Sequence, residues 1–213
     1  LYGGFKFYQR SEIKDILAYL QVINDHDEIS LLRIINIPRR KISDATVKIL
    51  LDHSVKYNLK LWESLVKADQ IDELTTAQKN AIKQFVQLIE LFKNQDQEDI
   101  ATFFDFIVDT IKYYDYAKTV HSVDKLEIIE RNLDELKNSI LNFKARRANK
   151  WSLNDYLNEI ALFTSLDDKK KHDNAVTLMT IHAAKGLEFS YVFLVNFNDG
   201  VFPSKYSLSE HNG

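Results

Sequence analysis

Residues 123–143 read VDKLEIIERNLDELKNSILNF, and apolar side chains recur in this stretch every three or four positions. These side chains are Val123, Leu126, Ile129, Leu133, Leu136, Ile140 and Phe143. Such spacing places them along one face of an α-helix, which can bury that face against a core. We therefore predict one amphipathic helix over about residues 123–147.

The same helical pattern extends over most of the chain. No glycine lies between Gly4 and Gly186, and Pro38 is the only proline in that interval. A long interval without the residues that usually end helices is typical of helices joined by polar turns. The fold is therefore predicted to be mainly α. Further helices are expected at about residues 11–23, 29–36, 44–55, 61–68, 77–94, 98–120 and 153–166, with candidate N-caps at Ser11, Thr76, Ser122 and Ser152.

Short apolar segments near both ends of the sequence predict β-strands instead. Residues 2–8 suit a short strand entered through a glycine turn. Residues 175–182 and 191–195 read as buried parallel strands, because they are short continuous apolar runs. The charged segment at residues 167–173 is the predicted domain boundary ahead of them.

A polar elbow separates the last two predicted strands. It contains Thr180, His182, Lys185 and Glu188, with Gly186 at its turn. Side chains beyond the carboxyl end of a strand lie where α/β sheets bind ligands. The residues alone leave open an ordinary strand–turn–strand with a solvated loop.

Composition limits the kinds of chemistry available. The chain has 213 residues, 45% apolar and 28% charged, which is ordinary for a globular protein. Without cysteine there are no disulfides, thiolate metal sites or cysteine nucleophiles, and a reducing compartment is expected. The histidines are not paired at metal-ligand spacing and no phosphate loop is present. We therefore predict neither a metal site nor a catalytic residue within this chain, and no membrane span.

A net charge of −3 means that any binding of nucleic acid depends on local basic patches. Arg39, Arg40 and Lys41 precede a predicted helix, a reasonable site for phosphate, although a basic loop in water is the alternative. Two other groups are interpreted structurally. The cations at 144–150 are expected to complement a helix dipole, and the aromatic side chains at 103–116 to form a buried helix. For the charges at residues 10–15, a solvated helix start is one alternative and a functional motif is the other.

Three segments resemble the UvrD/PcrA/Rep-type superfamily 1 DNA helicases. Residues 180–189, TIHAAKGLEF, closely resemble motif V of that family, and residues 7–15, FYQRSEIKD, resemble motif IVa. Phe202 and Pro203 match the end of the family's E-G-L-F-P continuation. The resemblance implies that residues 1–20 and 173–213 belong to a RecA-like α/β domain (2A). Residues 21–172 would form its helical insertion (2B).

No initiator methionine is present, so the chain is expected to be a fragment of a longer parent protein. The resemblance also implies a function for that parent. That parent would be an ATP-dependent 3′→5′ DNA helicase of the bacterial cytoplasm that serves repair or replication. It would use ATP and Mg²⁺, and would bind single-stranded DNA, duplex or junction DNA and possible repair or replication proteins. The alternatives are a non-catalytic helical protein-interaction module and a helicase–nuclease relative.

Site roles follow from the resemblance as well. Glu188 would bond the nucleotide ribose, with Gly186 forming the turn, and Thr180, His182 and Ala183 would lie near single-stranded DNA. The cations at 39–41 lie at the family's Pro-Lys/Arg-Arg-Gly-Ile-Gly pattern, which touches duplex DNA. Here residues 41–43 are Lys-Ile-Ser, a departure that weakens the prediction of duplex binding. The phosphate loop and the γ-phosphate arginines are missing, so this chain alone is predicted not to hydrolyse ATP.

Overall fold

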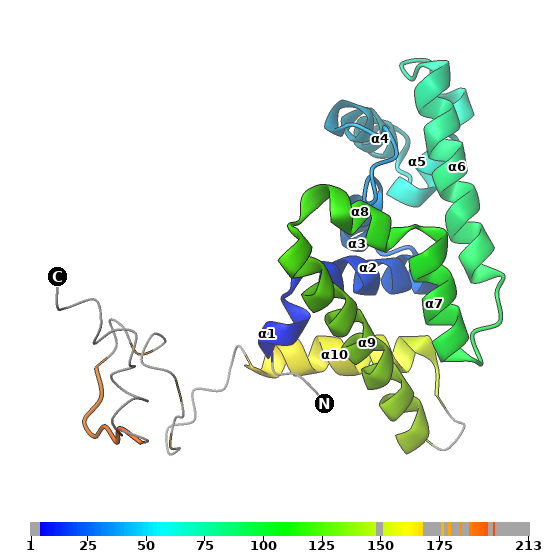
Figure 1. The fold of residues 1–213 in the computed structure, drawn as a ribbon. Helices are drawn as coiled ribbons and strands as arrows, with labels where there is room; N and C mark the ends of the chain where they lie inside the picture. The colour runs from blue at the N-terminus through cyan, green and yellow to red at the C-terminus, as the bar shows by residue number, and fades with distance from the viewer. Residues whose placement is uncertain are drawn as a thin grey trace. The chain divides into compact units, whose positions relative to one another are not determined.

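The computed structural model describes residues 5–147 and 151–167, together with Val176, Met179, Ala184, residues 188–195 and Asn198. The chain divides into two units, Leu1–Lys170 and Lys171–Gly213. The described residues of the first unit are almost entirely helical, which confirms the mainly-α prediction (Figure 1). Its helices are α1 (Phe5–Tyr8), α2 (Ser11–Asp25), α3 (Glu28–Ile34), α4 (Asp44–Tyr57), α5 (Leu61–Val66), the 3₁₀ helix η1 (Ala68–Gln70), α6 (Thr76–Lys93), α7 (Ile100–Thr110), α8 (Tyr113–Val120), α9 (Val123–Arg146) and α10 (Leu153–Asp167).

Helix α2 is the centre of the first unit. It packs against α1, α3, α6, α9 and α10. The apolar face predicted from its sequence is buried, and Ala18, Tyr19 and Val22 on its other sides are buried as well. A helix that is apolar on nearly all sides is stable only inside a core. Helices α7 and α8 pack on α9, and α4 and α5 pack on each other, so they form further layers outside these neighbours.

The predicted helix at residues 98–120 is two helices, α7 and α8. Lys112 has φ 53°, a left-handed conformation that interrupts the helical hydrogen bonds. Helix α8 therefore turns away and packs on both α7 and α9. No glycine or proline marks this break in the sequence. The aromatic side chains at 103–116 still belong to the core, as predicted, with Phe103, Phe104 and Tyr113 buried.

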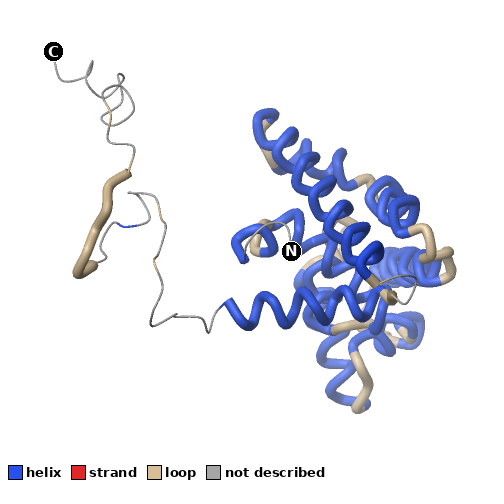
Figure 2. The backbone as a smooth tube through the Cα atoms, turned by 90° about the horizontal axis from the view of Figure 1, so that it is seen from below, coloured by secondary structure: helices blue, strands red, loops and turns tan. Residues whose placement is uncertain are grey.

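The strand predicted at residues 2–8 is wrong for the part that the structure describes, because residues 5–8 form α1. Phe7 and Tyr8 are buried there, and α1 lies against α2 and α10. A helical turn satisfies its backbone hydrogen bonds locally, whereas a strand needs a partner. Residues 191–195 have exposed side chains and no strand partner in the described chain, so the predicted strand is not formed there (Figure 2).

A solvated helix start at residues 10–15, the alternative to a motif there, does not hold for the two acids. Glu12 and Asp15 are buried, with 7% and 4% of their surfaces exposed. Asn132 of α9 donates a hydrogen bond to Glu12, and Arg10 donates one to Asn132. These partners lie far away in the sequence, so the local pattern could not reveal them.

Two predicted caps shift by one residue. The N-cap of α2 is Arg10 instead of Ser11, and Thr75, not Thr76, caps α6. Thr75 and Gln78 form a capping box, in which each side chain bonds the backbone N–H of the other residue. Ser152 caps α10 as predicted, accepting from the N–H of Asp155 over 3.1 Å. In the part of the chain that the structure describes, we find no helix with the length and apolar character of a membrane span.

Candidate nucleic-acid interface

The turn between α3 and α4 carries the basic segment at residues 39–41. Ile35 and Ile42 are buried on either side of it and fix its two ends in the core. The Asn36 side chain accepts a hydrogen bond from the backbone N–H of Arg40 over 2.7 Å. The Ile37–Pro38 peptide bond is cis. The basic segment is therefore held at several points and does not form a free loop.

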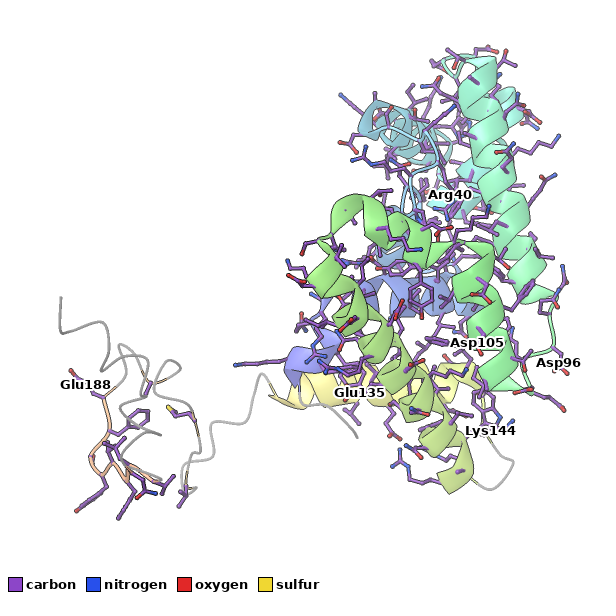
Figure 3. The ribbon with its side chains drawn as sticks, in the orientation of Figure 1. Arg40, Asp96, Asp105, Glu135, Lys144 and Glu188 are labelled. Atoms are coloured by element: carbon purple, nitrogen blue, oxygen red, sulfur yellow. The ribbon has the colours of Figure 1, made fainter. Side chains whose placement is uncertain are left out.

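Arg40 is bound within the protein. Its Nη1 donates to the carbonyl oxygens of Ile34 and Pro38 over 3.1 and 2.9 Å, and its Nη2 donates to the Tyr19 hydroxyl. The guanidinium also lies 5.4 Å from the ring centre of Phe85. Figure 3 labels Arg40 among the side chains between α4 and α6. This predicted DNA-binding residue thus holds the turn against α2 and α6.

Tyr19 completes this arrangement. Its hydroxyl donates to the carbonyl of Ile37 over 2.5 Å while accepting from Arg40. Burial raises the pKa of Tyr19 to about 12, an effect that the nearby Arg40 charge only partly opposes. The hydroxyl therefore stays protonated and keeps its bond to the turn at neutral pH.

The environment of Arg39 and Lys41 is the opposite of that of Arg40. Both side chains are exposed, and within the described residues neither forms a hydrogen bond or an ion pair. Lys41 has φ 63°, a left-handed conformation at the position where the helicase pattern has glycine. The backbone shape expected of a glycine is therefore kept, with a charged side chain added.

These residues form one side of an open groove with a volume of about 560 Å³. Its lining consists of Arg39, Arg40, Lys41 and, from α6, Ala77, Asn80, Ala81, Gln84, Phe85 and Leu88. Among the residues that the structure describes, the polar part of this lining consists of cations and amides, without a carboxylate. Donors of this kind suit an anionic chain such as a sugar–phosphate backbone.

A hydrogen bond outside the groove lining joins α6 to α4. The Gln78 side chain donates to the Thr46 hydroxyl over 2.8 Å, which connects the N-termini of α6 and α4. Thr46 is fully buried and also contacts the hydroxyl of Ser43, the N-cap of α4. These bonds tie the start of α4, which follows the basic segment, to α6, which lines the groove.

The second basic cluster has a structural role. Arg146 and Arg147 both pair with Glu159 of α10, over 3.1 and 3.5 Å. Lys144 donates to the carbonyl of Glu98 and lies over the Trp151 ring. These contacts attach the end of α9 to its neighbours. Lys150 lies outside the described residues.

The residues of the polar elbow belong to the second unit. Thr180, His182, Ala183 and Gly186 lie outside the described residues. Glu188 is described, and it is exposed in a non-helical segment. The roles of these residues in binding the nucleotide and single-stranded DNA stay predictions.

Sequence reasoning missed Asn80 and Gln84. Both are exposed amides on a long amphipathic helix, and such residues usually only solvate the outer face. Their spacing of one helical turn and the basic segment were both visible in the sequence, but the sequence did not show that they line one groove. Only the tertiary structure, which brings the turn between α3 and α4 beside α6, reveals the groove.

Residues 1–212 match the family described as the UvrD-like helicase C-terminal domain. The chain belongs to this family. The match extends over nearly the whole sequence, which supports the helicase resemblance of the two terminal motifs. It includes both the helical unit with the groove and the residues of the polar elbow.

Similar proteins include the ATP-dependent DNA helicase PcrA of Bacillus subtilis (strain 168), which is 37% identical over 98% of this chain and 29% of its own length. PcrA of Staphylococcus epidermidis is 34% identical over 94% of the chain and 28% of its own length. PcrA of Staphylococcus aureus (strain Mu50 / ATCC 700699) is 31% identical over the same shares. The chain thus spans under a third of the length of the curated relatives it matches.

Proposed function

We propose that this chain is part of an ATP-dependent DNA helicase of the UvrD/PcrA type, and that its helical unit is a 2B-like DNA-contacting arm. The match to the helicase family over residues 1–212 supports the first part. The proposed parent uses ATP and Mg²⁺, works in the bacterial cytoplasm and unwinds DNA with 3′→5′ polarity. The proposed partners are single-stranded DNA, duplex or junction DNA, and repair or replication proteins.

One observation carries the proposal of DNA contact. Arg39 and Lys41 line an open groove and have no partner within the described protein, while the adjacent Arg40 is fully engaged. Cations without a protein partner can bind phosphate without first breaking an ion pair. On this proposal Arg39 and Lys41 contact the duplex backbone, and Arg40 supports them by holding the turn.

The distribution of charge supports the same face. Residues 39–60 contain six lysines or arginines and two acids, whereas residues 96–135 contain eleven acids and four lysines or arginines. Figure 3 places Arg40 near α4 and α6, away from Asp105 on α7 and Glu135 on α9. A polyanion would be attracted to the first region and repelled by the second.

The roles of the second unit rest on the resemblance alone. We propose that Glu188 bonds the nucleotide ribose, that Gly186 allows the turn beside it, and that Thr180, His182 and Ala183 contact single-stranded DNA. The chain by itself is proposed to lack ATPase activity, because it contains no phosphate loop.

Fluorescence anisotropy tests the DNA contact, with the 213-residue chain and labelled single-stranded, duplex and junction oligonucleotides over a salt series. We expect preference for duplex or junction DNA. The salt slope, which is the steepness of the fall of log affinity with log salt concentration, should decrease by about 0.9 in Arg39→Ala. Arg131→Ala is the matched control, because Arg131 is exposed on the acidic helix α9. No binding at low salt would favour the non-catalytic protein-interaction module.

A separate assay tests the proposed lack of ATPase activity. Phosphate release from ATP and Mg²⁺ is measured with the chain, with Glu188→Ala and with no protein. We expect all three to agree. Release above the blank that the Glu188→Ala variant abolishes would contradict the proposal.

A further inference from the structure

We infer that α6 forms the second wall of a preformed channel for one sugar–phosphate strand of duplex DNA, with Asn80 and Gln84 donating hydrogen bonds to its phosphate oxygens. This inference rests on the proposed DNA contact and deepens it, because it assigns the opposite wall and the mode of recognition. Variants of α6 and of the basic segment distinguish a failure of this inference from a failure of the proposed DNA contact.

The positions of the amides on α6 support this role. Asn80 and Gln84 are one helical turn apart and lie on the face that lines the groove with residues 39–41. Both are exposed, and within the described chain neither side chain has a hydrogen-bond partner. Gln78, on the same helix, is occupied by Thr46 and Thr75. The groove-facing amides are therefore the ones left available for a ligand.

The remaining lining selects the kind of ligand. Ala77, Ala81, Phe85 and Leu88 supply small or apolar surface beside the amides on the α6 wall. This surface fits the C–H groups of a sugar, while donors at the sides fit phosphate oxygens. Amides and cations that bind the backbone carry no sequence information. Binding in this channel is therefore independent of base sequence.

The left-handed backbone conformation of Lys41 also supports a binding site in the groove. Of the described non-glycine residues with positive φ, His26 and Asn58 end helices and Lys112 begins one. Lys41 lies at no helix end, and its left-handed conformation disfavours any residue with a Cβ atom. Strain of this kind is typical of binding sites. Here it keeps an unpaired ammonium group at the rim of the groove, opposite the α6 amides.

The channel is preformed because contacts between its walls hold it open. Arg40 lies over the Phe85 ring of the other wall, and the Gln78–Thr46 hydrogen bond links α6 to the helix that follows the basic segment. A site that is already arranged loses less entropy when the ligand binds. Neutral amides can then contribute to affinity without the counterion release that cations produce.

The test compares variants in anisotropy titrations with two duplexes of unrelated sequence over a salt series. We expect Asn80→Ala combined with Gln84→Ala to weaken binding about tenfold on both duplexes. The salt slope should stay unchanged, because no charge is removed. Lys41→Ala should lower the slope by about 0.9 instead. Gln87→Ala is the matched control, since Gln87 is an exposed amide of α6 outside the groove.

The Gln84→Glu variant separates an effect on binding from an effect on folding. It keeps the shape of the side chain and adds a negative charge that repels phosphate. It should weaken duplex binding while the helical circular dichroism stays that of the unsubstituted protein. If the unsubstituted protein binds and Arg39→Ala weakens it, but the α6 variants behave like Gln87→Ala, the inference is overturned and the proposed function stands. No binding by the unsubstituted protein overturns both.

Discussion

The hydroxyl of Tyr113 on α8 donates a hydrogen bond to Oδ2 of Asp15 on α2 over 2.7 Å. Both residues are buried, and Arg33 of α3 donates to the other carboxylate oxygen over 2.8 Å. A buried carboxylate is tolerated only when its charge and its lone pairs are satisfied. Three helices are therefore joined at one side chain in the centre of the unit.

Removing the Tyr113 hydroxyl should destabilise the protein. In Tyr113→Phe we expect the free energy of unfolding to fall by about 1–3 kcal/mol, because a buried acceptor loses its donor. Urea denaturation followed by circular dichroism measures the change. Tyr57→Phe is the control, since Tyr57 is 55% exposed, and it should shift stability little. Equal stability of the two variants would contradict the role of the Tyr113–Asp15 bond.

The neighbours Arg39 and Arg40 should differ sharply in their effect on stability. Arg40→Ala removes two bonds to backbone carbonyls and the bond to Tyr19, so we expect a loss of about 2 kcal/mol. Arg40→Lys should not restore it, because an ammonium group cannot reproduce the planar fork of donors. Arg39→Ala should change thermal stability by less than about 0.5 kcal/mol. A similar loss in both alanine variants would show that Arg40 does not hold the turn.

Lys41→Gly should make the protein more stable and the DNA complex weaker. Glycine adopts the observed φ of 63° without a Cβ clash, so we expect a gain of about 1 kcal/mol in chemical denaturation. Lys125→Gly in the exposed surface of α9 should instead lose about 1 kcal/mol. Destabilisation by Lys41→Gly would mean that the lysine side chain itself supports the turn.

Stability should decrease in strongly alkaline solution. Burial raises the pKa of Tyr19 from 10.0 to about 12, so the folded state holds this proton more tightly than the unfolded state. The stabilising contribution is complete below pH 10 and is lost as the pH rises towards 12. The free energy of unfolding, measured by urea titration across this range, should fall more steeply in the unsubstituted protein than in Tyr19→Phe. If the free energy of unfolding fell equally with pH in both proteins, the loss of stability would not come from Tyr19.

Several elements were predictable because their signals are local. The apolar spacing along α6, α9 and α10 reports a buried face whatever that face packs against. The N-caps could be found to within one residue for the same reason, since a cap bonds a backbone N–H three positions away. The motif at residues 180–189 likewise indicated the helicase family without any structure.

Other features depend on partners that are distant in the sequence. Helix breakage at Lys112 lets Tyr113 reach Asp15, and no residue near 112 predicts this contact. The groove requires the turn between α3 and α4 to lie beside α6, and the Gln78–Thr46 bond links α6 to the helix that follows this turn. Such contacts form only when the chain is folded, so composition and periodicity do not report them.

The sequence alone was enough to establish helical faces, the absence of cysteine chemistry and a family resemblance, because each depends on residue type and short spacing. Tertiary packing decided which cations remain available. Arg39 and Arg40 are identical residues in adjacent positions, yet Arg40 meets the hydroxyl of Tyr19 and the ring of Phe85 while Arg39 stays exposed. The direction of the turn between the buried residues Ile35 and Ile42 determines which arginine faces the core and which faces solvent.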